Sequence, residues 1–405
     1  MIYLSDIYQL AKIELSIIFI AAFIACQNDE EMPIDKYYQG ENQQTVLLYF
    51  PWSGNGSDAG IYKDIQHNIS EIDAAIVKGR GMDGTSFLCF SAISPDSAFL
   101  YQIKYNKRTL QCDYDTIKTY VNLDYTSPDG VRQVMSDMKT FAPATNYGMV
   151  IGCHGMGWTL KSSIFKERRK YFGGITYEDD NGTRTITEKY VTDINDFVKG
   201  VADANVKFEY IVFDDCYMAN VEVVFDMQAI TRFFIASTSE IVSRGLPYSM
   251  IFNYLVATPD YEAIVNGFCD FYSSYYAPYG ALAAIDCSQI NKMAELVNLI
   301  NANADYDNLD IEKLQKLDGY KPTIFFDFAD YVRNICQDNL LLQKFEQQLK
   351  LLVPYAKSTP YLYSMQLRSA YLVKSFSGLT ISEPSKNALA ANYYSTNWFI
   401  ATHNL

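Results

Sequence analysis

The feature that most constrains the fold is a regular alternation of short apolar runs with amphipathic stretches of helical spacing. The expected strands span residues 45–52, 86–92, 147–153, 210–214, 233–237 and 281–286, and the expected helices between them span residues 61–77, 131–141 and 187–204. Strands that are apolar throughout are buried on both faces, as in parallel sheets that helices cover on both sides. The sequence therefore predicts an α/β fold with a mostly parallel sheet sandwiched by helices.

Two parts of the chain depart from this alternation. Residues 99–105 and 109–114 predict a β-hairpin, because two β-type runs are separated by a short polar stretch. From residue 291 onward the pattern is mainly helical, with a return to strand expected over residues 371–381. We therefore expect a core over residues 45–290 and a mainly helical C-terminal subdomain over residues 291–405.

The chain carries an excess of acidic side chains. Its 47 Asp and Glu residues against 33 Lys and Arg residues give a formal net charge of −14. Nucleic-acid binding needs cationic side chains that neutralise phosphates, so this surface repels DNA and RNA on average. Hydrophobic residues make up 49% of the chain and charged residues 20%, which is typical of a folded globular protein and not of a disordered one. The composition thus predicts a folded protein with no nucleic-acid partner.

The N-terminus carries an uncharged apolar run, residues 15–25, which ends at Cys26 and is followed by acidic residues. The run is about half the roughly 20 residues that span a bilayer, so it predicts the core of a signal peptide. A small residue before a cysteine resembles the lipobox of bacterial lipoproteins, in which the cysteine is lipidated. This resemblance implies a signal peptide over residues 1–25, a tether over residues 26–44, and a membrane anchor at Cys26 in the bacterial cell envelope, periplasmic or surface-exposed. The alternative is a buried first helix.

The eight cysteines exclude two kinds of site by their spacing. The nearest neighbours in sequence, Cys269 and Cys287, are 18 residues apart, so no C-x-x-C pair exists for a dithiol redox site or a zinc ribbon. If Cys26 is lipidated, seven cysteines remain and at least one thiol stays unpaired.

A histidine and a cysteine follow two of the expected buried strands. His154 comes directly after residues 147–153, and Cys216 comes two residues after Asp214, which ends the strand at 210–214. Function in parallel sheets collects at the carboxyl ends of the strands. An imidazole beside a thiol provides a nucleophile and a proton donor for the leaving amine, which suffices for acyl transfer. The backbone N–H groups of Gly155 and Cys216 are candidates for an oxyanion hole.

Other common chemistries lack their motifs. The chain has no Gly-x-Ser-x-Gly elbow, no phosphate-binding Walker loop, no His-Glu-x-x-His zinc helix and no EF-hand-like loop. The sequence therefore requires no cofactor.

Taken in order, these elements resemble the clostripain family of cysteine peptidases, relatives of the caspase and gingipain fold. The resemblance covers about residues 45–286. It rests on the strand-His-Gly element at 151–157, the strand-Asp-x-Cys element at 213–216, the segment 235–240, and the Gly-Leu-Pro-Tyr turn at 245–248.

The resemblance implies roles for particular residues. His154 and Cys216 would form a catalytic dyad. Asp214 would lie at the base of the S1 pocket and pair with a substrate Arg or Lys, and Glu240 would add a second acidic wall. Self-cleavage is expected within the basic insertion at 161–184, and calcium is a metal ion that such enzymes can use. The alternatives are that Asp214 is a helix-capping or loop carboxylate and that the insertion is a solvated loop.

Three functional hypotheses follow. The first is a lipid-anchored cysteine endopeptidase that cleaves proteins or peptides after Arg or Lys through a thioacyl intermediate. The second is a non-catalytic surface lipoprotein that binds glycans or proteins, which the 15% aromatic content favours. The third is a family member that keeps the fold without turnover.

Overall fold

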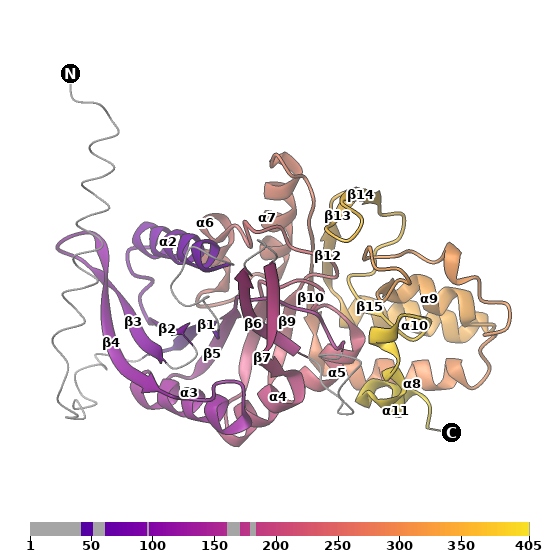
Figure 1. Ribbon diagram of the computed structural model, residues 1–405, viewed down its shortest axis with the longest axis horizontal. Coiled ribbons are helices and arrows are strands. Elements are labelled where there is room, and N and C mark those ends of the chain that lie inside the picture. The colour runs from indigo at the N-terminus through magenta and orange to yellow at the C-terminus, as the bar shows by residue number, and fades with distance from the viewer. Residues whose placement is uncertain (1–41, 52–60, 95–96, 160–170, 179–183, 405) are drawn as a thin grey trace. The chain divides into compact units, whose positions relative to one another are not determined.

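The protein is described from a computed structural model (Figure 1). The structure describes residues 42–51, 61–94, 97–159, 171–178 and 184–404. The chain divides into residues 1–39 and one compact unit over residues 40–405. The expected signal peptide, Cys26 and the parts of the insertion at 160–170 and 179–183 lie outside the described residues. Among the described helices, none combines the length and the apolar character that a membrane crossing requires.

A nine-stranded sheet forms the centre of the unit. Its strands are β1 (Gln44–Phe50), β2 (Thr85–Ser94), β3 (Ser97–Asn106), β4 (Gln111–Val121), β5 (Asn146–Ile151), β8 (Phe208–Phe213), β9 (Thr231–Ala236), β10 (Ala281–Asp286) and β12 (Tyr355–Ser358). They lie in the order β12-β10-β9-β8-β5-β1-β2-β3-β4. The central strands β9, β8, β5, β1 and β2 pair in parallel, and the strands at both edges are added antiparallel. This arrangement confirms the predicted fold class.

Helices cover both faces of the sheet (Figure 1). They are α2 (Tyr62–Lys78), α6 (Tyr248–Ile251) and α7 (Tyr261–Ser274) on one face, and α3 (Pro128–Phe141), α4 (Ile194–Asp203) and α5 (Val221–Met227) on the other. Successive side chains of a strand point to opposite faces, so Leu47 and Tyr49 of β1 join one core while Leu48 and Phe50 join the other. The double burial explains why the strands are apolar throughout.

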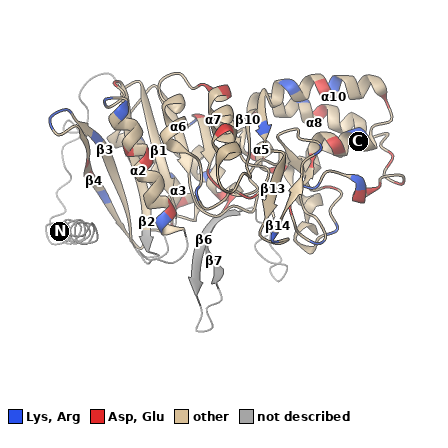
Figure 2. Ribbon diagram, turned by 90° about the horizontal axis from the view of Figure 1, so that it is seen from above, with Lys and Arg blue, Asp and Glu red and all other residues tan. Residues whose placement is uncertain are grey.

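The C-terminal part extends the same core. It contains α8 (Ile290–Asn301), α9 (Phe328–Ile335), α10 (Asn339–Leu352), α11 (Asn397–Thr402), β11 (Phe326–Asp327) paired with β15 (Thr380–Ile381), and the hairpin of β13 (Tyr361–Ser364) and β14 (Ser369–Leu372). Short 3-10 helices lie at Phe252–Leu255, Cys287–Gln289, Ile311–Lys313, Ala388–Ala390 and Tyr393–Ser395. Acidic residues lie on α2, α7 and α10, and thus in both parts of the unit (Figure 2).

Two sequence-based predictions are partly wrong. Residues 187–193 belong to strand β7 (Arg184–Asp193), which pairs with β6 (Tyr171–Glu178), and the helix predicted over 187–204 begins only at Ile194. The segment is rich in Thr, Ile and Val, which favour strands, and Asp193 caps α4 by accepting a hydrogen bond from the Asn195 N–H. The strand predicted over 371–381 is split into β14 and β15, and Gly378, at a φ of +79°, lies between them.

Candidate active site

The register between β5 and β8 sets the geometry of the candidate site. The two strands are parallel neighbours in which Ile151 pairs with Phe213, and the Asp214 N–H donates to the Ile151 carbonyl oxygen at 2.8 Å. His154 and Cys216 each lie three residues beyond this last pair. Equal offsets from one register pair bring the two loops to the same edge of the sheet.

Gly155 lies where the two loops touch. A Cβ at this position would fall 2.4 Å from the Cys216 carbonyl oxygen and 2.8 Å from the Asp215 Cβ. No side chain fits at that separation, so the histidine loop can approach the cysteine loop only with glycine here. The oxyanion role expected for the Gly155 and Cys216 N–H groups stays a prediction.

The Cys216 thiol is partly buried and lies against the loop that follows β9. Its Sγ accepts a hydrogen bond from the Ile241 N–H at 3.3 Å. Burial, together with the nearby carboxylates of Glu240 and Asp215, raises the pKa of the Cys216 thiol to about 12, so the resting residue is a neutral thiol.

The His154 imidazole is neutral in the same state. Burial lowers the pKa of His154 to about 4, since a charged ring is disfavoured away from water. A neutral imidazole can accept a proton, whereas a protonated one cannot. The two resting groups are thus a neutral thiol and a neutral imidazole, which are the protonation states from which general-base catalysis starts.

Asp214 is 9% exposed and its carboxylate is held by three neutral donors. Asn68 of α2 donates to Oδ2 at 3.1 Å, the Tyr248 hydroxyl donates to Oδ2 at 2.9 Å, and the Leu246 N–H donates to Oδ1 at 2.9 Å. Gly245, at a φ of +67°, leaves room for this carboxylate, because a Cβ there would lie 2.6 Å from Oδ2. Burial raises the pKa of Asp214 to about 6.

Glu240 lies beside the nucleophile loop, but its carboxylate is occupied by other protein groups. It accepts hydrogen bonds from the Tyr217 hydroxyl at 2.7 Å and the Ser364 hydroxyl at 3.1 Å. The Met365 N–H donates to both oxygens, at 2.9 and 3.1 Å. The second acidic wall expected from Glu240 stays a prediction.

Sequence reasoning missed Asn68 and Asp215. Asn68 is 5% exposed on the apolar face of α2, and a polar residue among the isoleucines of that face was a usable signal. Asp215 is 1% exposed, and its carboxylate accepts from the Cys153 N–H at 2.6 Å and from the Cys153 thiol at 3.1 Å. Asp215, which directly precedes Cys216, is thus bonded to Cys153, which directly precedes His154. The sequence showed only two adjacent aspartates there.

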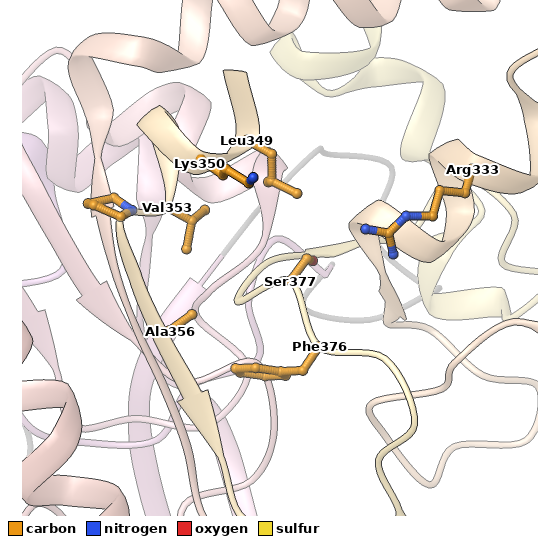
Figure 3. Close-up of a pocket in the computed structure, with 8 residues that line it drawn as sticks. Arg333, Leu349, Lys350, Val353, Ala356, Phe376 and Ser377 are labelled. Atoms are coloured by element: carbon orange, nitrogen blue, oxygen red, sulfur yellow. The ribbon is translucent and has the colours of Figure 1, made fainter. Parts of the chain in front are cut away.

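Two further features bear on ligands. A cavity of about 250 Å³ lies between α9, α10 and β12 (Figure 3), and none of the expected site residues lines it. Its walls are formed by Arg333, Leu349, Lys350, Val353, Pro354, Ala356, Phe376 and Ser377.

Within the described ranges, no group of three or more His, Cys, Asp or Glu side chains is placed to hold a metal ion. The seven cysteines in the same ranges form no disulfide bonds with one another.

Comparison with known families and proteins identifies relatives. A model of the clostripain family matches residues 96–373. None of the curated proteins compared with the chain matches it.

Several solved structures are similar to the chain. A secreted C11 cysteine protease from Bacteroides thetaiotaomicron, iotapain, is 36% identical with a TM-score of 0.82, and the match covers 90% of this chain and 100% of that one. A clostripain from Bacteroides thetaiotaomicron ATCC 29148, in complex with the peptide inhibitor BTN-VLTK-AOMK, is 42% identical over 55% of this chain and 99% of its own, with a TM-score of 0.53. An inactive zymogen C11 protease from Parabacteroides distasonis, 22% identical with a TM-score of 0.74 over 91% of this chain and 100% of its own, shares the fold.

Proposed function

Because the chain belongs to the clostripain family of cysteine peptidases, we propose that it is an endopeptidase that cleaves peptide bonds after Arg or Lys. In this proposal Cys216 is the nucleophile and His154 is the general base and acid. The observation that carries the proposal is the β5–β8 register, which leaves both residues three positions beyond one strand pair.

The chemistry follows from the two neutral groups. His154 takes the proton from Cys216 as Sγ attacks the substrate carbonyl carbon, and the oxyanion forms near the Gly155 and Cys216 N–H groups. The tetrahedral intermediate collapses, the C–N bond breaks, and His154 gives its proton to the leaving amine. Water, deprotonated by His154, then attacks the thioester, releases the carboxylic acid and restores the thiol.

Asp214 is the proposed determinant of basic specificity. Its described hydrogen-bond donors are neutral, and burial raises its pKa to about 6 although the nearby Arg244 acts to lower it, so a further cation would stabilise the ionised carboxylate. A substrate guanidinium or ammonium would supply that cation and lower the pKa. The related clostripain was captured with an inhibitor whose peptide part, VLTK, ends in Lys.

The sequence supports two further parts of the proposal. The apolar run at 15–25 and Cys26 support a signal peptide and a lipid anchor in the bacterial cell envelope. The basic stretch at 161–170 supports self-cleavage between His154 and Cys216, since an enzyme that prefers Arg and Lys would recognise such a segment.

Peptide cleavage by the full-length chain tests the proposal. We expect fluorogenic peptides ending in Arg or Lys to be turned over, peptides ending in Asp or Leu to be left intact, and Cys216→Ala to abolish turnover. Cys336→Ala, which removes another partly exposed thiol, is the control and should retain activity. A nick within residues 161–184 that is absent from Cys216→Ala would support self-cleavage. If no peptide is cleaved with or without calcium, the peptidase proposal fails.

A further inference from the structure

Glu240 joins three segments that are far apart in the sequence. It follows β9, it accepts from Tyr217 next to the candidate nucleophile, and it accepts from Ser364 and Met365 in the turn of the β13–β14 hairpin. The adjacent Ile241 supplies the N–H that hydrogen-bonds the Cys216 Sγ. The Glu240 carboxylate is therefore bonded to the residue that follows Cys216, and its own backbone precedes the residue whose N–H contacts the thiol.

Tyr217 needs this support because its backbone is strained. It has a φ of +59°, in the left-handed region that costs a non-glycine residue free energy. Its side chain is 3% exposed and stacks on Phe325 with ring centroids 5.0 Å apart. The Tyr217 N–H donates to the Ser239 carbonyl oxygen at 3.0 Å. The hydroxyl bond to Glu240 completes a set of contacts that holds the residue after Cys216 in this conformation.

The turn of the β13–β14 hairpin is shaped so that Ser364 and Met365 donate hydrogen bonds to Glu240. The Ser364 hydroxyl accepts from the Gln366 N–H at 3.1 Å while it donates to the Glu240 carboxylate. Gly319 packs directly against this hydroxyl, since a Cβ there would lie 2.1 Å from Oγ. Ser364 is fully buried, whereas Met365 at the tip is 67% exposed. The contact therefore anchors an exposed hairpin turn through the buried Ser364 at its base.

We propose that Glu240 is a positioning residue, whose carboxylate couples the β13–β14 hairpin to the backbone around the Cys216 thiol. This inference rests on the proposed role of Cys216 as nucleophile. Tyr217, Ser364 and Met365 hold both oxygens of the Glu240 carboxylate, which ties it to the residue after Cys216 and to the hairpin. Asp214, on a different segment, remains the proposed partner of the substrate cation.

The test compares Glu240→Gln with Glu346→Gln, which removes a charge from an exposed ion pair with Arg333 on α10 and α9. For Glu240→Gln we expect kcat to fall at least about tenfold for Arg and Lys peptides alike, because small misplacement of a reacting group is costly. In Glu240→Gln, KM and the preference for Arg over Lys should change by less than about twofold. Ser364→Ala should also lower kcat, but by a smaller factor than Glu240→Gln does. Glu346→Gln should match the unsubstituted protein.

Alkylation of Cys216 by iodoacetamide provides a readout that needs no turnover. Its rate against pH should shift in Glu240→Gln and stay unchanged in Glu346→Gln. A selective rise in KM for Arg and Lys peptides with an unchanged alkylation profile would identify Glu240 as an acidic wall and overturn the inference. A lower melting temperature with unchanged kcat and alkylation would also overturn it. Loss of the proposed function appears separately, as an unsubstituted protein that cleaves nothing, and alkylation then still tests the coupling.

Discussion

Asp215 shows how one side chain sets the spacing of the two candidate catalytic loops. Its carboxylate accepts from both the N–H and the thiol of Cys153, the residue before His154, while its own backbone leads directly into Cys216. The carboxylate is almost completely buried, and burial raises the pKa of Asp215 to about 7 from 3.8. Asp215 therefore links the loop geometry to pH.

The sign of this pH dependence follows from proton counting. Between about pH 4 and about pH 7 the folded protein binds a proton at Asp215 that the unfolded chain has released, so the free energy of unfolding falls as pH rises. Asp215→Asn does not titrate, and we expect its stability to fall less steeply over this window, by at most about 1.4 kcal/mol per pH unit. Urea unfolding of both proteins at several pH values measures the difference. Parallel pH profiles would contradict the assignment.

Among single residues, the sequence drew attention to the candidate catalytic residues but not to the side chains that surround them. His154 and Cys216 stood out because each lies within two residues of the end of an apolar run, which is a local pattern. The partners of Asp214 come from α2 and from the segment after β9, and two of the partners of Glu240 come from a hairpin more than a hundred residues away. Which side chains meet across such distances depends on the packing of the whole unit.

Among the secondary-structure elements, helix α2 is bonded through its polar side chains to the loop that leads into α6. Asn68 reaches Asp214, and Glu71, one turn further on, pairs with Arg244 and accepts from the Ser249 hydroxyl at 3.0 Å. The same helix buries its isoleucines against the sheet. The helix thus carries both packing residues and polar residues that hold the floor of the proposed specificity pocket.

Removing the side-chain amide of Asn68 should weaken the hydrogen bonding of the Asp214 carboxylate at the base of the proposed specificity pocket. In Asn68→Ala the Asp214 carboxylate loses one donor to its charged form, so its pKa should rise above about 6 and less of it is ionised. We expect KM for Arg peptides to rise about three- to tenfold, most strongly at low pH, with kcat within about twofold. Gln66→Ala, on the exposed face of α2, is the matched control. Equal kinetics for the two variants would argue against the assignment of Asp214.

For the whole molecule, the C-terminal residues complete the core of the sheet domain. Trp398 of α11 is fully buried against Phe225 and Phe328, with ring centroids 5.9 and 5.8 Å apart. The Trp158 indole, in the loop after His154, donates to the Ser382 hydroxyl at 2.8 Å. The last thirty residues therefore stabilise the same unit that carries the candidate site.

Truncating Trp398 tests this dependence. Trp398→Ala should lower the free energy of unfolding by about 3–5 kcal/mol, since a large buried aromatic leaves a cavity. Ile400→Ala, on the same helix but at a side chain that is 47% exposed, should change it by less than about 0.5 kcal/mol. Thermal or urea unfolding measures both. Similar small losses would show that α11 is dispensable for the core.

The central sheet was largely predictable from the sequence, because its strands are marked by short apolar runs that can be recognised one by one. Apolar runs such as 45–52 and 281–286 recur as β1 and β10, because burial on two faces leaves no room for polar residues. The β6–β7 pair and the split of 371–381 were not predictable, because their strands form small two-stranded sheets and lack such runs. The antiparallel edges likewise depend on connections that sequence patterns do not specify.

The β5–β8 ladder has a consequence for any break in the chain between residues 160 and 170. One fragment would carry β1 to β5 and the histidine, the other β8 to β12 and the cysteine, and they would meet in the middle of the sheet. The two fragments of such a protein would be held together by this pairing in the sheet. The protein would fold once as a unimolecular reaction, but after full denaturation its reassembly would be bimolecular and would slow as the protein is diluted.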